Sequence, residues 1–128
     1  MPKAAADGQC QKCAAAWLAD RRDVTTAYAL GISTPGPSMW EEPPPCSYTD
    51  PEIFFADAGT HDEQHAIRMC TSCPVRALCL AYALHLEQGA ATTGRRGIWA
   101  GTSPRERRAL HEHAMAIRSR EARREAEV

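Results

Sequence analysis

The chain has 128 residues, enough for one small domain, and its large core side chains are few: two Phe, three Trp and three Tyr. A domain with so few bulky residues usually needs disulfides or a metal to hold it together. There is no signal-peptide pattern and no apolar run long enough to cross a bilayer, which excludes a membrane partner and predicts a cytoplasmic protein with reduced thiols. The net charge of −1 is uninformative by itself, but its distribution favours a polyanion or an acidic protein partner at the C-terminal end. Residues 1–64 hold 4 basic and 10 acidic side chains, whereas residues 65–128 hold 11 and 6.

The first predicted element is an alanine-rich helix over residues 14–30. A proline- and glycine-rich linker follows over residues 31–45. A short helical turn is expected at 50–55, and the pattern at 60–63 is a capping box that opens a helix running towards Cys70.

Pro74 suits the first position of the next helix, so that Cys73 is expected near the N-cap, where the positive helix end favours a thiolate. Residues 88–97 form a loose loop, and a second capping box at 103–106 begins the last helix. The expected apolar faces of these two helices are Val75, Cys79, Tyr82 and Leu86, and Leu110, Ala114 and Ile117. Because no strand pattern of any length appears, the sequence predicts a small all-α domain of three to four helices.

Four cysteines have a spacing that indicates a metal site. The pattern C-x23-C-x2-C-x5-C joins Cys46, Cys70, Cys73 and Cys79. Four thiolates can hold either zinc or a [4Fe–4S] cluster, and although the second short knuckle typical of zinc sites is missing, spacing alone leaves both metals open. A thioredoxin-type dithiol is disfavoured because no βαβ pattern surrounds the pair. Cys10 and Cys13 are interpreted as incidental or redox-labile.

The candidate contact residues lie in the second half of the chain. Trp99 stands in a predicted turn between Gly97 and Gly101, where the sequence alone favours a core tryptophan over an exposed anchor. An arginine cluster in the loop and first turn of the last helix is interpreted as a DNA contact. Its members are Arg95, Arg96, Arg105, Arg107 and Arg108. A second basic group at 118–124 is better explained as a solvated helix face.

Several of these segments together resemble the WhiB-like regulators, the iron–sulfur transcription-regulator family of actinobacteria and their phages. The resemblance covers about 40–118 and agrees in order, spacing and flanking residues. Its motifs are Trp40, Cys46, Asp50-Pro51-Glu52-Ile53-Phe54-Phe55, Cys70-Thr-Ser-Cys73-Pro74-Val75, Cys79-Leu80, Gly97-Ile98-Trp99-Ala100-Gly101 and Ser103-Pro-Arg-Glu-Arg-Arg-Ala-Leu110. The family turn usually has glycine where Ala100 stands, and alanine is strained there if the position needs a positive φ.

The resemblance implies a [4Fe–4S] cluster, sensitive to oxygen or nitric oxide, on Cys46, Cys70, Cys73 and Cys79. It also implies that the cluster domain docks on the C-terminal domain of the primary sigma factor in the RNA polymerase holoenzyme. The aromatic residues that match this docking are Trp40, Phe54, Phe55 and Trp99, so that for Trp99 the resemblance favours the exposed anchor. Because Phe54 and Phe55 are adjacent, one is expected in the core and the other at the contact surface.

The sequence therefore predicts a redox- or nitric-oxide-responsive transcriptional regulator that binds sigma factor and promoter DNA, and not an enzyme. The expected parts are an N-terminal extension (1–39), a cluster domain (40–101) and an arginine-bearing C-terminal helix (102–128). One alternative is disulfide reductase activity of the apo form through Cys70 and Cys73. Another is a zinc-stabilised interaction module, which metal analysis distinguishes.

Overall fold

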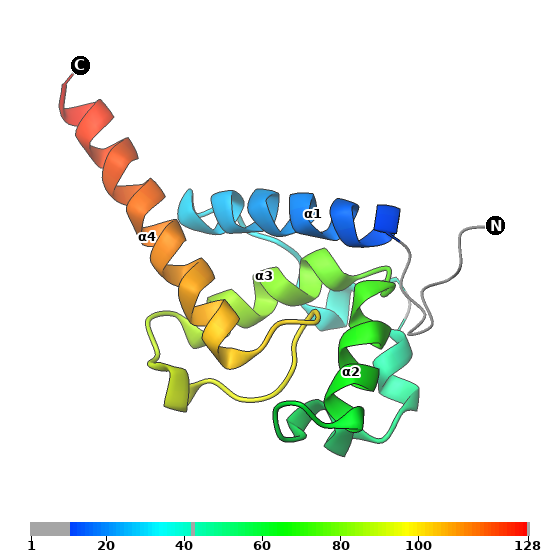
Figure 1. Cartoon of the computed structure of the whole chain (residues 1–128). Helices are drawn as coiled ribbons and strands as arrows, with labels where there is room; N and C mark the ends of the chain where they lie inside the picture. The colour runs from blue at the N-terminus through cyan, green and yellow to red at the C-terminus, as the bar shows by residue number, and fades with distance from the viewer. Residues whose placement is uncertain (1–10, 42, 128) are drawn as a thin grey trace.

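The computed structural model describes residues 11–41 and 43–127, with side chains described from Leu18 onward. Four α-helices and four short 3-10 helices make up this part of the chain, which contains no β-strand, so the predicted all-α class is confirmed (Figure 1). In chain order they are α1 (Gln11–Ala29), η1 (Pro37–Met39), η2 (Pro45–Tyr48), η3 (Pro51–Phe55), α2 (His61–Thr71), α3 (Arg76–Glu87), η4 (Thr92–Gly94) and α4 (Pro104–Ala126).

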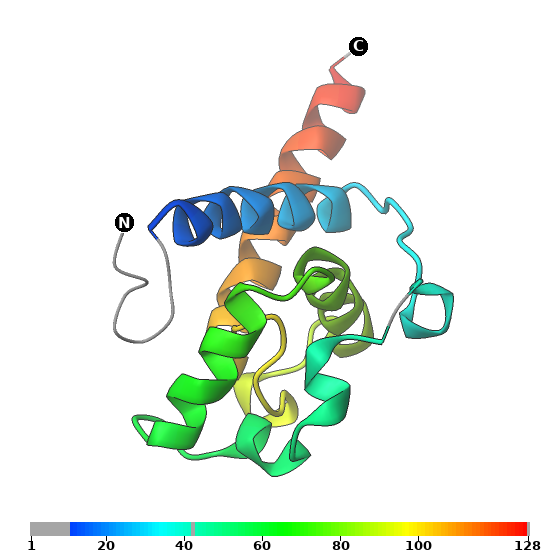
Figure 2. The ribbon, with the colours of Figure 1, turned by 90° about the vertical axis from the view of Figure 1, so that its right-hand side faces the viewer.

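The N-terminal helix α1 packs across both α3 and α4, and the C-terminal half of α4 extends past it, away from the rest of the chain (Figures 1 and 2). Helices α2 and α3 follow each other directly with a bend of 114°. This sharp bend turns the end of α2 and the start of α3 towards each other, which matters for the cysteines that they carry.

Two clusters of buried side chains form the core. The first contains Leu80, Leu84 and Ala100, with Val24, Tyr28, Ala77, Cys79 and Leu110 packed against it. The second contains Ile53, Ala66, Cys70 and Ile98, with Phe54 and Ile67 packed against it. Because each cluster includes or contacts a predicted metal ligand, the core and the candidate site share their walls.

The buried face of α3 differs from the prediction. Leu80, Ala83 and Leu84 are buried, whereas Leu86 is 56% exposed. This helix is apolar around most of its circumference (RALCLAYALHLE), so periodicity alone does not identify one face. The packing of α1 against α3 decides which side is covered.

Helices α2 and α4 begin where their capping sequences predict. At α4 the capping box is complete: the Glu106 N–H donates to Ser103 Oγ (3.2 Å) and the Ser103 N–H to Glu106 Oε1 (3.0 Å). At α2 the box is only half formed, because Thr60 accepts from the Glu63 N–H while the Glu63 carboxylate accepts from the Gly59 N–H instead.

The start of α3 lies later than predicted. Its N-cap is Val75, so Cys73 and Pro74 lie in the preceding turn, which the Arg76 N–H closes by donating to the Cys73 carbonyl (3.2 Å). Cys73 is therefore not the N-cap residue.

Within the described residues, no single helix has the length and apolar composition of a membrane span. The bent pair α2–α3 reaches that criterion only when its two helices are counted together.

Candidate metal centre

The four predicted ligands line one cavity of about 540 Å³. Cys46 comes from η2, Cys70 from the last turn of α2, Cys73 from the turn after it and Cys79 from α3. All four are free thiols, with Cys70 buried and the other three partly exposed. The thiols therefore gather around one space although they come from separate elements.

The bend between α2 and α3 brings three of the cysteines together. The Cys73 N–H donates to the Cys70 carbonyl (3.0 Å), and the Cys79 N–H donates to the Val75 carbonyl (2.8 Å) in the first turn of α3. The Arg76 guanidinium reaches back to the Thr71 carbonyl at the end of α2 and pairs with Asp20 of α1 (3.2 Å). The junction is thus held by backbone and side-chain bonds on both sides.

Three of the thiols, those of Cys46, Cys70 and Cys79, have raised pKa values. Burial raises the pKa of Cys70 to about 11 and that of Cys79 to about 12. Burial, and to a lesser extent the neighbouring Cys73, raises the pKa of Cys46. Hydrogen bonds from the backbone of Ala100 and Gly101 act in the opposite direction without offsetting burial. A metal centre supplies the positive charge that such buried thiols need to ionise, and its binding releases their protons.

Within the Cys70–Cys73 pair, the raised pKa of Cys70 is the opposite of what a redox nucleophile needs, because an attacking thiol has a lowered pKa. No disulfide reductase activity is therefore proposed.

In the described part of the chain, no three His, Cys, Asp or Glu side chains are placed to hold a single metal ion.

Five aromatic side chains line the same cavity: Tyr82 and the four predicted contact residues Trp40, Phe54, Phe55 and Trp99. As expected for adjacent residues, one phenylalanine packs on the core while the other is 59% exposed; these are Phe54 and Phe55 respectively. Each indole N–H has a backbone acceptor, the Pro35 carbonyl for Trp40 (3.0 Å) and the Arg96 carbonyl for Trp99 (3.1 Å). The Trp99 ring is partly exposed and also contacts Tyr82, at a centroid distance of 6.2 Å.

The turn that carries Trp99 requires its glycine at position 97. Gly97 has φ +75°, and a Cβ there would lie 2.9 Å from the Phe55 ring and 3.1 Å from the Phe54 carbonyl oxygen. The next residue is bound to the same segment, because the Ile98 N–H donates to the Phe54 carbonyl (2.7 Å). The glycine therefore allows the turn to lie directly against η3.

The far end of the turn contains two consecutive residues with positive φ, Ala100 (+53°) and Gly101 (+72°). The expected strain at Ala100 is therefore present, since alanine has a Cβ that disfavours this region. A Cβ on Gly101 would lie 3.5 Å from the Cβ of Cys70, so the turn lies directly against this predicted ligand.

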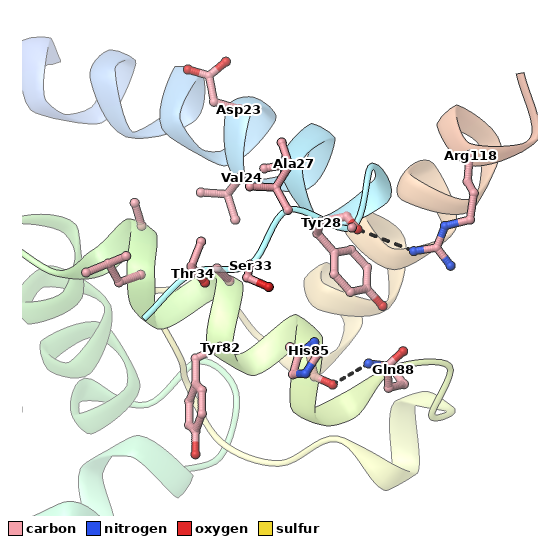
Figure 3. A pocket seen from close by; sticks show the side chains of 15 residues that line it. Asp23, Val24, Ala27, Tyr28, Ser33, Thr34, Tyr82, His85, Gln88 and Arg118 are labelled. Atoms are coloured by element: carbon pink, nitrogen blue, oxygen red, sulfur yellow. Dashed lines mark hydrogen bonds between the residues drawn. The ribbon is translucent and has the colours of Figure 1, made fainter. Parts of the chain in front are cut away.

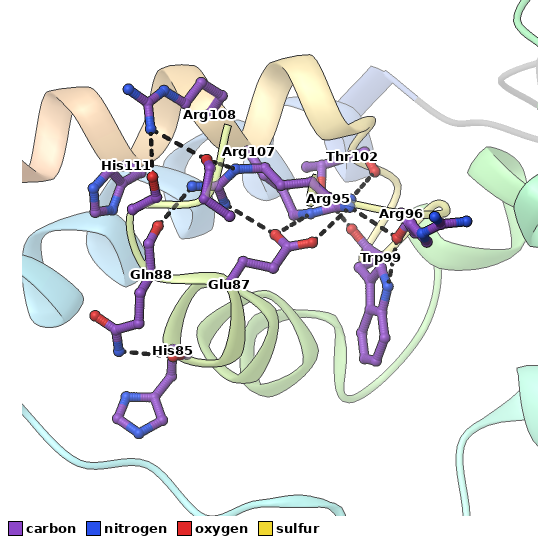
Figure 4. A network of polar contacts seen from close by, with 12 residues as sticks. His85, Glu87, Gln88, Arg95, Arg96, Trp99, Thr102, Arg107, Arg108 and His111 are labelled. Carbon is purple, nitrogen blue, oxygen red and sulfur yellow. Dashed lines mark hydrogen bonds and ion pairs between the residues drawn. The ribbon is translucent and has the colours of Figure 1, made fainter. Parts of the chain in front are cut away.

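The five arginines expected at DNA differ in their surroundings. Arg95 and Arg107 are 3% and 0% exposed and both pair with Glu87, at 3.0 and 2.8 Å (Figure 4). Their guanidinium groups lie inside the protein, so contact with phosphates is not proposed for them. Arg96 and Arg105 are exposed, and Arg108 is half-buried with bonds to Glu112 and the Gly89 and Ala90 carbonyls.

Sequence reasoning missed Glu87. It is the single acidic residue between positions 64 and 106, and it precedes an arginine pair by eight residues. A lone acid in a basic, apolar stretch is a signal for a buried ion pair, because an unpaired buried charge is strongly unfavourable.

A second cavity of about 440 Å³ opens between α1, residues 31–34 and α3 (Figure 3). Tyr28, Tyr82, His85 and Arg118 are among its lining residues, and Arg118 is held there by the carbonyls of Tyr28 and Ala29. Tyr82 of α3 lines both cavities.

Comparison with known proteins finds a matching family and several related proteins. The family described as "Transcription factor WhiB" matches residues 40–110, more than half of the chain. The chain is 43% identical over 76 residues to the transcriptional regulator WhiB of Streptomyces coelicolor, covering 59% of this chain and 79% of that protein. It is 45% identical over 72 residues to WhiB2 of Mycolicibacterium smegmatis, covering 56% of this chain but only 50% of the relative, and 42% identical over 72 residues to WhiB2 of Mycobacterium tuberculosis, covering 56% and 73%. No solved structure matches the chain.

Proposed function

The chain belongs to the WhiB family of transcription factors, and from this premise we propose that it regulates transcription as an iron–sulfur protein. The ligands of its [4Fe–4S] cluster are Cys46, Cys70, Cys73 and Cys79. The observation that carries the proposal is that these four thiols line one cavity together with five aromatic side chains. When bound, the cluster supplies a centre that reacts with oxidants and nitric oxide.

The chemistry of the cavity suits a cluster. Four cysteine thiolates are the usual ligands of a [4Fe–4S] centre. A zinc ion is enclosed by its four sulfurs at about 2.3 Å each and needs no space beyond them. A cavity of about 540 Å³ between the cysteine-bearing elements therefore favours the larger group.

Anaerobic purification with iron and sulfide quantification tests the cluster. We expect about four iron and four sulfide per chain, with Cys79→Ser losing most of both and the Cys10→Ser/Cys13→Ser double variant retaining them. Less than about one iron per wild-type chain contradicts the proposal, and stoichiometric zinc in its place identifies the zinc-stabilised module.

The proposed protein partner is the C-terminal domain of the primary sigma factor, and the proposed contact is the aromatic surface formed by Trp40, Phe54, Phe55 and Trp99. Large aromatic side chains that remain exposed are typical anchors of protein interfaces. Phe55 is 59% exposed beside the cavity, and Trp99 is held by its indole N–H with the ring partly exposed.

Trp99→Ala tests this contact in a binding measurement with the sigma domain. We expect an affinity loss of about 30-fold or more, as for an interface anchor. Tyr48→Ala is the matched control, because Tyr48 is an 80% exposed aromatic residue that does not line the cavity. Full affinity in Trp99→Ala removes the docking proposal.

For promoter DNA, the proposed contacts are Arg96, Arg105 and Arg108. Each phosphate contact adds about 0.9 to the slope of log K against log salt concentration. We expect Arg96→Ala/Arg105→Ala to reduce this slope by about 1.8, while the exposed Arg120→Ala leaves it as in wild type. An unchanged slope in the double variant excludes these contacts.

A further inference from the structure

We propose that Arg107 is the positioning residue of the Trp99 ring. A side chain expected to face DNA instead holds residues 96–102 in the shape that presents Trp99 to a protein partner. The effect on the ring stands on the structure alone, and the consequence for binding rests on the sigma-factor contact proposed above.

All five N–H donors of the Arg107 guanidinium are used inside the protein (Figure 4). Nε and Nη2 donate to the two carboxylate oxygens of Glu87, at 2.8 and 3.1 Å. Nη1 donates to the carbonyl (2.6 Å) and Oγ1 (3.4 Å) of Thr102, and Nη2 also donates to the Arg96 carbonyl (3.1 Å). One guanidinium therefore connects the end of α3 to both ends of the turn, and no donor is left for a phosphate.

The Arg96 carbonyl is the point at which Arg107 acts on the ring. This oxygen accepts from the Trp99 indole N–H (3.1 Å) as well as from Arg107 Nη2 (3.1 Å). The acceptor that orients the indole is thus itself held in place by a side chain that is 0% exposed.

Thr102 holds the other end of the turn in the same way. The Trp99 N–H donates to the Thr102 carbonyl (3.2 Å), and the Thr102 N–H and hydroxyl both donate to the Trp99 carbonyl (2.9 and 2.5 Å). Since Arg107 binds the carbonyl and the hydroxyl of Thr102, it also fixes the residue that closes the turn.

Arg95 and Glu87 make the burial of Arg107 possible. Arg95 donates to Glu87 Oε1 (3.0 Å) and to the Gln88 and Ala90 carbonyls just beyond the C-terminal end of α3. The two arginines outnumber the one carboxylate, and the negative end of the α3 dipole together with these carbonyls offsets the surplus positive charge. Glu87 is thereby held rigidly enough to orient the Arg107 fork.

The geometry requires arginine and not only a positive charge. A lysine ammonium can pair with Glu87, but it is a single point and cannot reach Glu87, Thr102 and Arg96 together as a planar fork does. Arg107→Lys is therefore the main test variant. Arg107→Met is the second, since it removes the whole guanidinium fork and leaves Glu87 paired with Arg95. Arg120→Lys makes the same chemical change at an exposed position of the same helix and is the matched control.

The experiment measures hydrogen exchange of the tryptophan indole N–H groups by NMR on the full cluster-loaded chain, together with affinity for the sigma domain. In Arg107→Lys we expect the Trp99 indole N–H to exchange roughly tenfold faster, as for the loss of one charge-assisted hydrogen bond in the network. The Trp40 indole N–H, bonded to Pro35, should exchange as in wild type, and sigma affinity should fall. Arg120→Lys should change neither quantity.

If either folded test variant keeps wild-type exchange at Trp99, Arg107 does not position the ring and the inference is overturned. A fall in sigma affinity without a change in Trp99 exchange overturns it as well. If Trp99 exchanges faster in the test variants but the wild-type protein does not bind the sigma domain, the positioning role is supported and the proposed partner is excluded. If Arg107→Lys does not fold, Arg107→Met decides between the same outcomes.

Discussion

Ala100 combines a backbone conformation that alanine disfavours with a fully packed position. Its φ is +53°, and its side chain is 2% exposed against Leu80 and Leu84. Alanine in this region costs about 1–2 kcal/mol relative to its right-handed conformation, while its buried methyl contributes about 0.8 kcal/mol. The two terms nearly cancel.

We therefore expect Ala100→Gly to change the free energy of unfolding by less than about 1 kcal/mol. Ala100→Val should lower it by about 2–3 kcal/mol, since a β-branched side chain is disfavoured at positive φ and has no room in the core. Urea unfolding followed by circular dichroism measures both, with Ala109→Val on the exposed side of α4 as the control. A tolerated valine at position 100 contradicts the strain argument.

His111 predicts a pH dependence of stability. Its pKa is lowered, first by burial and then by the charges of Arg95, Arg108 and Arg118, and its Nδ1 is hydrogen-bonded to the Tyr28 hydroxyl (2.8 Å). The folded state thus binds this proton less readily than the unfolded state. The stability linked to His111 is present above its ordinary pKa of 6.5 and is lost as pH falls below it.

The urea midpoint should therefore fall between pH 7 and pH 5, and His111→Asn, which cannot titrate, should make this fall shallower. His113→Asn, at an exposed position of the same helix, should leave the wild-type slope. Equal slopes for wild type and His111→Asn would exclude the linkage.

At the scale of single residues, the sequence predicted the four thiols that line one cavity and the strained alanine, but not the surroundings of the arginines. The proposed metal ligands are recognised by their spacing, which is a property of the chain. Whether Arg95 or Arg107 meets solvent or Glu87 depends on how α3 and α4 pack, because Glu87 and Arg107 are 20 residues apart and meet only in the folded chain.

At the scale of elements, the starts of α2 and α4 are the features that local sequence specifies most completely. Ser103, Pro104 and Glu106 predicted the first turn of α4, and both hydrogen bonds of the capping box are present. The α2 box is half formed because Gly59, with φ +83°, brings its N–H to the Glu63 carboxylate. A cap bond needs only residues within one turn, so it can be recognised without the tertiary fold.

The same cap gives a prediction for α4. Ser103→Ala removes the acceptor for the Glu106 N–H at the point where the Trp99 turn passes into the helix. We expect a loss of about 1 kcal/mol in the free energy of unfolding. Ser119→Ala, in the exposed interior of α4, should be neutral or slightly stabilising because alanine favours helices. Equal effects of the two substitutions in urea unfolding would argue against a role for the cap.

For the whole molecule, two kinds of connection hold the helices together. Polar bonds join α1 to the second half of the chain, from Arg21 to Glu106 (3.3 Å), from Tyr28 to His111 and from Arg118 to the Ala29 carbonyl (3.1 Å). The proposed cluster joins η2, α2 and α3 through their cysteines. Because large core side chains are few, we expect the proposed cluster to carry much of the stability.

Removal of the cluster by chelation should therefore lower the midpoint of thermal unfolding by more than about 10 °C. Cys10→Ser/Cys13→Ser should show the same drop from the same starting value, since these cysteines lie outside the C-x23-C-x2-C-x5-C pattern of the proposed ligands. Thermal melts of loaded and apo protein, followed by circular dichroism, make the comparison. An apo protein as stable as the loaded one shows that the core alone holds the fold.

The sequence by itself determined the all-α class, the starts of α2 and α4 and the four thiols, because each depends on spacing or on contacts within a helical turn. It also pointed to the aromatic residues around the cavity, through their resemblance to a known family. The tertiary structure alone decided which face of α3 is buried, which phenylalanine is exposed and where each arginine points. Those outcomes depend on which side chains, from positions far apart in the sequence, become buried when the helices pack together. Glu87 pairs with the guanidinium groups of Arg95 and Arg107 inside the protein. Two arginines that resemble DNA contacts in the sequence are therefore buried.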